Sequence, residues 1–385
     1  MIPEVWQTRV RQSLEAHFSA GLQRSRRHAF DACGPLRRIE GRDFLTFASN
    51  DYLGLAADPR IKDALRNAVG HWGLGSGAAQ LLGGYTAAHK GLEERLADWV
   101  GQPRALLFST GYQANLAMLD ALAGKGDLIC EDRLNHASLI DAARISGATL
   151  RRYLHTDSDS LDRRLEKARA DHALVATDSV FSMDGDLAPL TELATVARRH
   201  DALFLVDDAH ALGVIGDQGC GAAASSGANP ALVMATLGKA LGSFGAFLAG
   251  NEDLIEWVAQ TGRAHIYTTA PPPAVAAATL VAVELARQED WRRQKLAELI
   301  HRLRSGAAKR GIELLPSDTP IQPLVLRSVE RAASVSEGLA QQGIWVPAIR
   351  PPTVPADSCR LRITLTAAHE PAHVDRLLEA LESIL

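Results

Sequence analysis

The sequence predicts an α/β fold built around a large, mostly parallel β-sheet. Short apolar and β-branched runs alternate with longer segments of helical periodicity through the middle of the chain. That alternation is typical of a sheet covered by helices on both faces. The chain has 385 residues, 46% of them hydrophobic, so it can bury a substantial core and is long enough for one large domain and at least one smaller one.

Four short apolar runs are predicted strands of this sheet. They are Ala105–Phe108, Ala173–Thr177, Leu203–Val206 and Leu232–Thr236. Between the second and third runs, residues 190–200 place apolar side chains at helical spacing and end in Arg198, Arg199 and His200, cations that suit a helix C-terminus. We therefore expect a crossover helix there.

The pattern along the chain predicts three segments. They are residues 1–45, 46–286 and 287–385. The first is expected to form an amphipathic helix and a short hairpin around Gly41, and the second is the large domain. The third begins with a charged helix that contains Trp291 and continues with strand-like runs at Pro323–Leu326 and Leu361–Leu365, which predict a smaller α+β domain.

Composition and charge exclude several classes of protein. The formal charge of -4 and the scattered basic residues give no electrostatic footprint for nucleic acid. The four cysteines show no C-x-x-C spacing, so neither a metal site nor a disulfide framework is predicted, and a reducing, cytoplasmic setting fits best. The N-terminus is too charged for a secretory signal, and the most apolar stretch, Ala274–Val283, is shorter than the roughly 20 residues of a membrane span.

The first candidate for chemistry is Asp207, which directly follows the predicted strand Leu203–Val206. Ligands of open α/β sheets bind beyond the carboxyl ends of the strands, so this carboxylate points toward the predicted functional crevice. The alternative is that Asp207 caps a helix, a position that Asp also favours. Taken alone, the residue leaves both interpretations open.

The second candidate is Lys239, which lies in a loop of small residues after another predicted strand. A lysine that forms an imine needs a neutral amine, and burial among small apolar neighbours lowers its pKa toward that state. A solvated loop lysine is the alternative, but Gly238 and Gly242 favour close approach of the backbone to a ligand. A P-loop is rejected because Ala240 stands where that motif needs Ser or Thr.

Together, Asp207 and Lys239 predict a pyridoxal 5′-phosphate site. The carboxylate would pair with the ring nitrogen while the lysine holds the aldehyde carbon. An ionised carboxylate keeps the ring nitrogen protonated, and the ring can then accept negative charge from a substrate's α-carbon.

A third candidate is the junction at Gly111, where a predicted strand ends and a helix starts. Free backbone N–H groups and the helix dipole bind phosphate at such junctions, although a plain turn is the alternative. His136 stands at another predicted helix start and could lie flat against an aromatic ring, or could simply be a capping or surface histidine. The glycines of Gly73–Gly77 lack the dinucleotide spacing, so we expect a flexible or substrate-lining loop there rather than an NAD site.

These motifs together resemble those of the α-oxoamine synthases, which are fold-type I pyridoxal phosphate enzymes related to aspartate aminotransferase. The resemblance covers essentially the whole chain. Besides the motifs around Asp207 and Lys239, it rests on Ser49–Leu55, Phe181–Asp186 and Arg350–Pro355. It implies a fold-type I transferase with a large sheet domain and a small C-terminal α+β domain.

Within this family, Arg350–Pro355 followed by Arg360–Thr366 is most similar to the enzymes of biotin synthesis that join L-alanine to a pimeloyl thioester. The resemblance implies a decarboxylative condensation that releases CO2 and a free thiol. The acyl donor would be pimeloyl-CoA or pimeloyl-ACP. The main alternative is a sister enzyme that joins glycine to acetyl-CoA, whereas a non-catalytic subunit is disfavoured because such subunits lack the lysine equivalent to Lys239.

The resemblance also implies a role for each matching residue. Lys239 would form the Schiff base, Asp207 would pair with the pyridine nitrogen, His210 would lie near the phenolic oxygen and His136 would stack on the ring and take part in catalysis. Further cofactor contacts are implied for Ser182, Gly111, Tyr112 and Thr236, and for Thr268 or Thr269 from the second subunit of a homodimer. Substrate contacts are implied for Arg24, Asn50, Arg350, Thr353 and Arg362.

Overall fold

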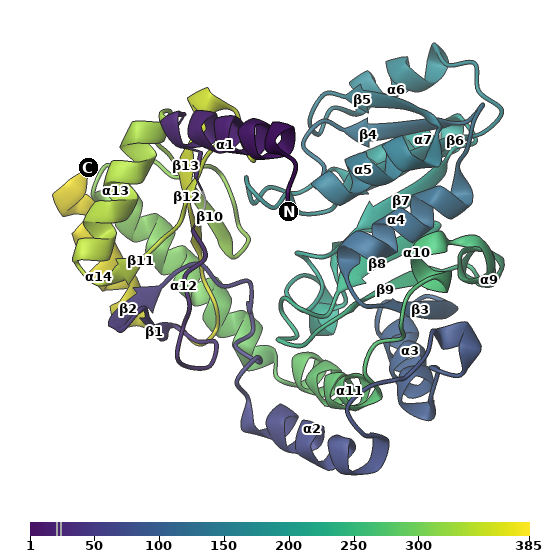
Figure 1. Cartoon of the computed structure of the whole chain (residues 1–385), viewed down its shortest axis with the longest axis horizontal. Helices are drawn as coiled ribbons and strands as arrows, with labels where there is room; N and C mark the ends of the chain where they lie inside the picture. Colours follow the sequence, from purple (N-terminus) through teal and green to yellow (C-terminus); the bar gives the residue numbers. More distant parts are fainter. Residues whose placement is uncertain (21, 24) are drawn as a thin grey trace.

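The computed structural model describes residues 1–20, 22–23 and 25–385, which form two lobes (Figure 1). The larger lobe contains a seven-stranded sheet with the strand order β3-β9-β8-β7-β6-β4-β5. In the described residues the smaller lobe contains two three-stranded sheets and carries the C-terminus. The predicted α/β fold class is confirmed.

The large sheet is mostly parallel, as predicted. Its strands are β3 (Arg104–Phe108), β4 (Leu128–Asp132), β5 (Thr149–Tyr153), β6 (Ala173–Asp178), β7 (Leu203–Asp207), β8 (Leu232–Thr236) and β9 (Ala246–Gly250). Strand β9 is antiparallel to both of its neighbours, β3 and β8, while the pairs from β8 to β5 are all parallel. The four predicted strands are confirmed to within one residue, and β4, β5 and β9 were missed.

Helices cover both faces of this sheet. The helices between β2 and the small lobe are α2 (Pro59–Trp72), α3 (Ala87–Trp99), α4 (Gly111–Leu122), α5 (Ala137–Ser146), α6 (Ser158–Glu166), α7 (Leu190–Arg199), α8 (Ala222–Ser225), α9 (Glu252–Thr261), α10 (Arg263–Ile266) and α11 (Pro273–Gln288), with the 3-10 turns η1 (Gln80–Leu82) and η2 (Asp217–Gly219). Of these, α2 packs on α11 rather than on the sheet (Figure 1). Helix α7 is the predicted crossover helix, and α11 contains the buried stretch 274–283.

Alternate residues of the central strands point into two separate apolar layers. One layer contains Ile129, Leu174 and Leu205, packed with Met118, Leu139 and Ile255 of α4, α5 and α9. The other contains Cys130, Val175 and Val206, packed with Leu96, Leu193 and Ala282 of α3, α7 and α11. Because both faces are buried, these strands read as continuous apolar runs in the sequence.

The smaller lobe is built from segments near both ends of the chain. Its elements are α12 (Asp290–Lys309), β10 (Ile321–Val325), α13 (Val329–Gln341), β11 (Ile344–Trp345), β12 (Ala348–Ile349), η3 (Ala356–Ser358), β13 (Arg360–Thr364) and α14 (Pro371–Ile384). The predicted hairpin consists of the antiparallel strands β1 (Leu36–Ile39) and β2 (Arg42–Thr46), and β2 also pairs in parallel with β11. Strand β13 lies between β10 and β12 in the other sheet. The three segment boundaries drawn from the sequence stay a prediction.

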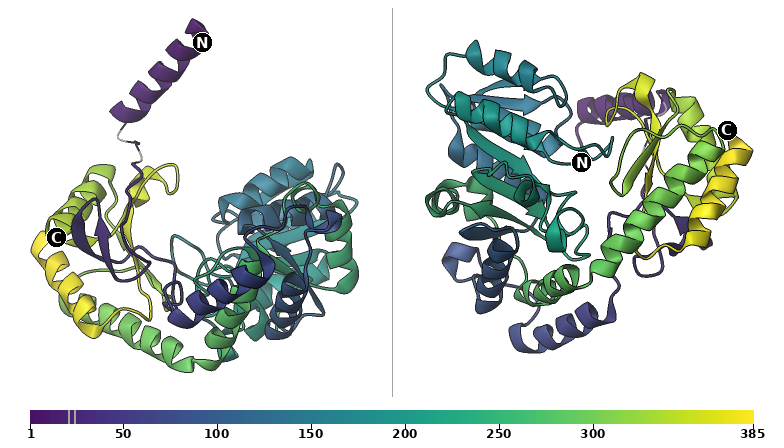
Figure 2. Two further views of the ribbon diagram at one scale, coloured as in Figure 1. Left: turned by 60° about the horizontal axis from the view of Figure 1, so that its bottom comes forward. Right: turned by 180° about the vertical axis from the view of Figure 1, so that it is seen from behind.

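Helix α1 (Glu4–Ser19) extends away from the rest of the chain (Figure 2). None of its residues is buried. The exposed side chains of Trp6, Val10, Leu14 and Phe18 recur every four residues along it. The predicted helix is confirmed, and its apolar stripe is open to a partner. Within the described part of the chain, none of the helices combines the length and apolar composition that a membrane-spanning segment needs.

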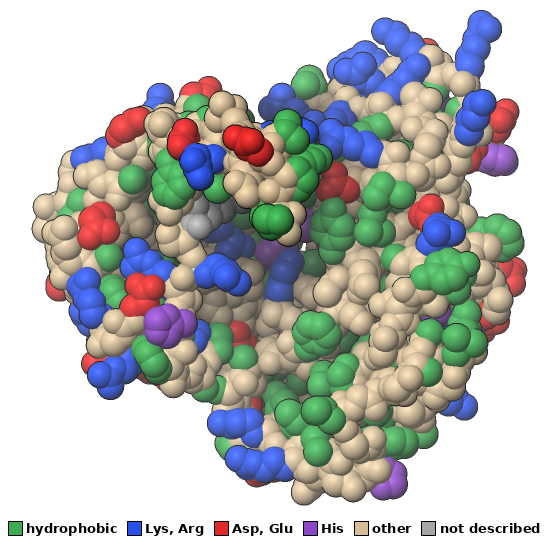
Figure 3. Space-filling view, in the orientation of Figure 1, with side chains coloured by type: hydrophobic (Ala, Val, Ile, Leu, Met, Phe, Trp, Pro, Cys, Tyr) green, Lys and Arg blue, Asp and Glu red, His purple; other side chains and the backbone are tan. Residues whose placement is uncertain are grey.

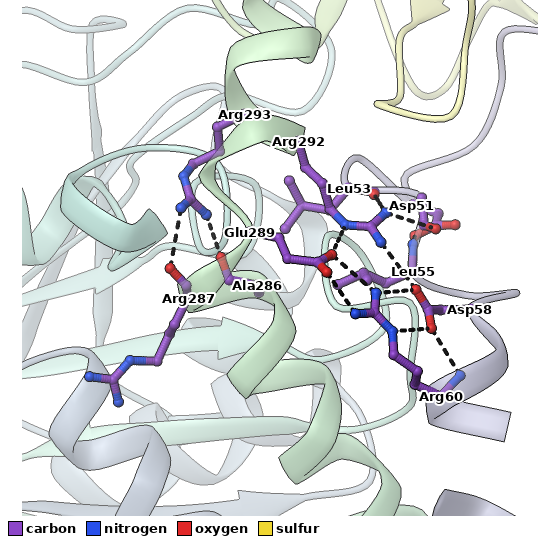
Figure 4. Close-up of polar contacts among 11 residues, drawn as sticks. Asp51, Leu53, Leu55, Asp58, Arg60, Ala286, Arg287, Glu289, Arg292 and Arg293 are labelled. Carbon is purple, nitrogen blue, oxygen red and sulfur yellow. Dashed lines mark hydrogen bonds and ion pairs between the residues drawn. The ribbon is translucent and has the colours of Figure 1, made fainter. Parts of the chain in front are cut away.

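An ionic junction joins the two lobes where α12 begins (Figure 4). Arg292 donates to the carbonyl oxygen of Leu53 at 2.7 Å and pairs with Asp58 at 3.1 Å and with Glu289 at 2.7 Å. Arg60, at the start of α2, binds the same two carboxylates at 2.8 and 2.6 Å. The loop that precedes α2 is thereby fixed to the helix that leads into the small lobe.

Candidate active site

Side chains from the C-terminal ends of β6, β7 and β8 meet in one cavity of about 170 Å³. The lining residues are Gly111, Tyr112, His136, Ser138, Asp178, Asp207, Ala209, His210, Met234, Thr236 and Lys239. The space-filling view shows a hollow between the two lobes with basic and histidine side chains at its floor (Figure 3). Most of the predicted cofactor residues therefore lie together at the edge of the sheet where ligands of open α/β folds bind.

A larger groove of about 850 Å³ lies on the small lobe between α12 and α14. Its charged side chains pair with one another, as in Lys295–Glu370 and Arg302–Asp375 at 2.6 Å each. These exposed ion pairs leave no buried reactive group in the groove among the described residues, so the smaller cavity is the candidate site.

Asp207 lies at the end of β7 and is 6% exposed. Its Oδ2 accepts a hydrogen bond from Asn115 at 2.8 Å, and its Oδ1 accepts one from the backbone of Ala209 at 3.1 Å. The helix-capping interpretation is wrong, because β7 runs through Asp207 and is followed by turns rather than by a helix. The carboxylate is therefore held rigidly and aimed into the cavity.

Lys239 lines the same cavity, with its Nζ 2.8 Å from Nε2 of His210. Burial lowers the pKa of the lysine to about 8, against the opposing effect of Asp207 and Asp178. Gly242 has a φ of +60°, and a Cβ there would collide with the backbone of Ala56. The glycine thus allows the tight loop that holds the lysine inside the protein.

His210 connects the lysine to a tyrosine. Its Nδ1 lies 2.6 Å from the hydroxyl of Tyr52, which is fully buried, and burial lowers the pKa of His210 well below its ordinary value. The sequence analysis quoted Tyr52 within the Ser49–Leu55 motif but gave it no role. Its position could not be anticipated, because 158 positions separate it from His210.

The predicted phosphate junction has the expected geometry. Helix α4 starts at Gly111, and the Oγ1 of Thr110 caps it by accepting a hydrogen bond from the backbone N–H of Gln113 at 3.2 Å. Gly111 and Tyr112 line the cavity opposite Thr236, the last residue of β8. A Cβ on Gly111 would lie 3.4 Å from the side chain of Met234, an ordinary van der Waals contact, so packing alone does not require glycine here.

His136 stands at the N-cap of α5, as the sequence predicted. Its backbone N–H donates to Oδ2 of Asp178 at 3.0 Å, and its Nδ1 lies 2.7 Å from Oγ of Ser138. Burial raises the pKa of Asp178 well above its ordinary value, and the nearby Asp207 adds to the effect. Asp178 and Ser138 are cavity residues that the sequence analysis did not identify.

Arg362 is a buried cation whose hydrogen-bond partners in the described part of the chain are all neutral. It is 7% exposed and donates to Asn50 Oδ1 at 3.0 Å, to Thr364 Oγ1 at 3.0 Å and to the carbonyl oxygen of Ser182 at 2.5 Å. Its neighbour on the same strand, Arg360, instead pairs with Asp184 at 2.7 Å. A buried guanidinium without a carboxylate partner is suited to an anionic ligand.

Arg362, Asn50 and Ser182 are not among the residues that line the cavity, and neither are Thr268, Thr269, Arg350 and Thr353. Thr268 accepts a hydrogen bond from Gln113 at 3.4 Å, and Thr269 is exposed. Arg350 donates to the carbonyl oxygen of Gln23 and accepts at its own carbonyl from the exposed Thr353 at 3.1 Å. Arg24 lies outside the described residues.

The fold and the site define a class of protein. A partly buried lysine of lowered pKa, lining one cavity with a carboxylate at the carboxyl ends of parallel strands, is typical of α/β enzymes that bind a carbonyl group covalently. The family model described as aminotransferase class I and II matches residues 42–381. The chain belongs to this family.

Curated relatives are similar over nearly the whole chain. The 8-amino-7-oxononanoate synthase of Alkalilimnicola ehrlichii is 52% identical over 381 residues, which cover 97% of each chain. The protein of the same name from Nitrosococcus oceani is 54% identical and covers 94% of this chain and 97% of its own.

Solved structures have the same fold. The serine palmitoyltransferase of Sphingomonas wittichii matches with a TM-score of 0.92 at 31% identity, covering 97% of this chain and 96% of its own. A serine palmitoyltransferase solved with pyridoxal phosphate matches equally well at 30% identity. The 8-amino-7-oxononanoate synthase of Francisella tularensis matches with a TM-score of 0.77 at 29% identity, covering 88% of this chain and 97% of its own.

Proposed function

We propose that the protein is a pyridoxal phosphate-dependent acyltransferase that condenses L-alanine with a pimeloyl thioester. The products are 8-amino-7-oxononanoate, carbon dioxide and a free thiol, in a step of biotin synthesis. The observation that carries the proposal is the 46–55% identity of nearly the whole chain to 8-amino-7-oxononanoate synthases. The geometry of the cavity supplies the groups that this reaction needs.

The cavity residues fit pyridoxal phosphate. Lys239 offers an amine of lowered pKa, Asp207 offers an oriented carboxylate, and Oδ1 of buried Asp178 has no hydrogen-bond partner among the described residues. Lys239 would hold the aldehyde carbon, Asp207 the ring nitrogen, and Gly111 and Thr236 the phosphate. Bound there, the cofactor supplies an acceptor for negative charge on the α-carbon of alanine.

Lys239 is suited to proton transfer as well as to cofactor binding. Its pKa of about 8 lies near physiological pH, where an amine can both take and return a proton. With the cofactor and alanine bound, Nζ would remove the α-proton of alanine. Its attachment inside a rigid loop keeps the amine next to the reacting carbon.

Arg362 would bind the carboxylate of alanine. A guanidinium can form two parallel hydrogen bonds with a carboxylate, and among the described residues this one has no acidic partner. Asn50 and the carbonyl of Ser182 hold its plane in place. The fixed carboxylate sets which bond of the α-carbon faces the reacting groups.

The other roles follow the family resemblance. His210 would lie near the phenolic oxygen of the cofactor, His136 would stack on its ring, and Ser182 and Tyr112 would contact it. Thr268 or Thr269 of a second subunit would complete the phosphate site in a homodimer. Arg24, Arg350 and Thr353 would lie toward the acyl donor, pimeloyl-CoA or pimeloyl-ACP.

One observation supports the proposed homodimer, and another supports a cytoplasmic location. The exposed apolar stripe of α1 offers a surface for a second copy of the chain. The cysteines are all free, which suits the reducing cytoplasm in which biosynthetic enzymes of this kind act.

The test is a substrate matrix with purified holoenzyme. L-alanine, glycine and L-serine are each combined with pimeloyl-CoA and with acetyl-CoA, and the condensation product and free thiol are measured by mass spectrometry and a thiol reagent. We expect turnover with L-alanine and pimeloyl-CoA, and none in the Lys239→Ala variant. Selective use of glycine and acetyl-CoA would assign the chain to the sister activity, and no product from any pair would overturn the proposal.

A further inference from the structure

A chain of hydrogen bonds connects Asp207 to His136 through two buried neutral side chains. Nδ2 of Asn115 donates to Oδ2 of Asp207 and to Oγ of Ser138, at 2.8 Å each. The same Oγ lies 2.7 Å from Nδ1 of His136, and the backbone N–H of Ser138 points to that nitrogen at 3.3 Å. Asn115 is 0% and Ser138 1% exposed, so water does not compete for these bonds.

The carboxylate sets the orientation of the Asn115 amide, and a backbone N–H sets the direction of the bond to His136. An ionised Asp207 only accepts hydrogen bonds, so the amide nitrogen of Asn115, rather than its oxygen, must face it. Both N–H bonds of that amide are then used, one on Asp207 and one on Ser138. Ser138 Oγ accepts from Asn115 and keeps its own hydrogen for donation. The backbone N–H of Ser138, which can only donate, also points to Nδ1 of His136, so this nitrogen is an acceptor and receives the hydroxyl hydrogen as well.

Two donors therefore converge on Nδ1 of His136, the Ser138 hydroxyl and the Ser138 backbone N–H. A ring nitrogen that accepts hydrogen bonds carries no proton, so the proton of the neutral imidazole lies on Nε2. Burial lowers the pKa of His136, and the charged groups that act on it are Asp207, Lys239 and Asp141. The neutral ring is thus the relevant form.

We propose that Asn115 and Ser138 are positioning residues that fix His136 in the Nε2–H tautomer, so that the ring presents a hydrogen-bond donor to the cavity. In the described residues Nε2 has no partner of its own, and His136 lines the cavity together with Lys239. The catalytic use of this donor rests on the proposed function. It would meet the thioester carbonyl oxygen, where negative charge develops during the condensation.

The tautomer can be measured without cofactor or substrate. The probe is NMR of deuterated protein with 15N-labelled histidine, at a pH where the imidazole is neutral. The chain has 13 histidines, so the His136→Gln variant identifies the signals by their loss. We expect the shift of an unprotonated nitrogen for Nδ1 and that of an N–H for Nε2. A protonated Nδ1 in the unmodified protein would overturn the proposal.

The test variant is Ser138→Ala, with Ser160→Ala as its control. Ser160 is also a buried serine, whose Oγ accepts from the backbone of Leu154 at 3.1 Å, and it lies outside the cavity. In Ser138→Ala the two ring nitrogens should shift toward each other as the tautomers mix, whereas Ser160→Ala should leave them unchanged. Unchanged shifts in Ser138→Ala would contradict the proposal.

Activity of the holoenzyme gives an independent readout. Loss of one positioning hydrogen bond should lower kcat by about fivefold to tenfold in Ser138→Ala. The KM for L-alanine should stay unchanged, because Arg362 is untouched. Mixed tautomers with an unchanged kcat would overturn the catalytic use of the donor. If the proposed function itself were wrong, the unmodified enzyme would lack turnover, but the NMR result would be unaffected.

Discussion

Lys239 and His210 form a partly buried pair in which Nζ of the lysine lies 2.8 Å from Nε2 of the histidine. Burial lowers the pKa of both groups, that of Lys239 to about 8. Since each cation disfavours the other, at most one of the two carries a charge near neutral pH. The pair therefore keeps an amine at the centre of the cavity that can become neutral, and hence nucleophilic, at moderate pH.

The rate of cofactor uptake should follow the ionisation of this amine. Only the neutral form attacks an aldehyde, and burial favours the neutral form, so the rate of pyridoxal phosphate binding by cofactor-free protein should rise with pH and level off above about 8. Stopped-flow absorbance of the bound cofactor measures this rate. A midpoint near the ordinary lysine value of about 10.4 would contradict the burial effect.

Replacement of the lysine should remove covalent attachment of the cofactor. Lys239→Ala has no amine in the cavity, so borohydride reduction should add no cofactor mass to the variant, whereas the unmodified protein should gain one cofactor per chain on this residue. Mass spectrometry of tryptic peptides locates the added mass. Lys90→Ala, at an exposed lysine paired with Glu94, is the control and should be labelled normally. Labelling of Lys239→Ala elsewhere would overturn the assignment.

Arg362→Lys should weaken the binding of L-alanine. Lysine keeps the charge but loses the paired N–H groups that grip a carboxylate, and a charge-assisted hydrogen bond contributes about 1.5–3 kcal/mol. The KM for L-alanine should therefore rise roughly tenfold to a hundredfold, while the KM for the acyl donor changes little. Steady-state kinetics at varied alanine concentration measure both.

Arg360→Lys is the matched control for that change. Arg360 lies on the same strand and is as buried as Arg362, but it already pairs with Asp184 at 2.7 Å and donates to the carbonyl of Met183 at 3.2 Å. We expect a lower melting temperature and an unchanged KM for alanine. If both substitutions raised the KM equally, the effect would come from loss of the strand's packing rather than from a carboxylate site.

The fold was predictable wherever burial left a simple pattern. Strands β6, β7 and β8 are apolar on both faces, so the sequence located them to within one residue. Strand β4 was missed because it carries Glu131 and Asp132, which are buried even though their side chains are charged in water. Edge strand β5 was missed because Arg151 and Arg152 interrupt its apolar pattern.

Site residues were predictable from the sequence where they lie at the end of a strand or directly after it. Asp207, Gly111 and Lys239 each lie at or just beyond a strand end, and a local motif marks each of them. Asn115 could not be assigned a role in the same way, because its partner Asp207 is 92 positions away. Contacts of this kind arise only when the parallel strands bring their ends together.

His155 should stabilise the contact between the end of β4 and the Phe181–Asp186 segment in a pH-dependent way. Burial alone would lower its pKa, but hydrogen bonds to Asp132 and Asp186 at 3.0 and 2.8 Å outweigh this effect and raise it to about 9. A raised pKa means that the protonated form stabilises the fold. The contribution to the free energy of unfolding, about 3 kcal/mol, should be complete below pH 6.5 and be lost as the pH rises through 9.

Thermal unfolding of His155→Gln checks this expectation. The variant should melt below the unmodified protein at pH 6, and the gap should shrink by pH 9.5. His172→Gln is the control, because His172 also contacts an aspartate, Asp127 at 3.0 Å, but its side chain is 80% exposed. If the difference in melting temperature between the two proteins grew with pH, protonation of His155 would not stabilise the fold.

Arg292→Met should weaken the junction between the lobes. The substitution keeps much of the side-chain volume but leaves Asp58 and the carbonyl of Leu53 without their buried partner. Removal of one member of a buried ion pair costs about 3–5 kcal/mol, and Arg60 still binds Asp58, so we expect a loss near the lower end of that range. Urea unfolding followed by tryptophan fluorescence measures this loss.

Arg66→Met is the control. It breaks only the exposed pair with Asp63 and should lower the free energy of unfolding by less than about 1 kcal/mol. Equal losses in the two variants would mean that the junction contributes no more than a surface ion pair, and the fixed geometry between the lobes would then have to come from apolar packing.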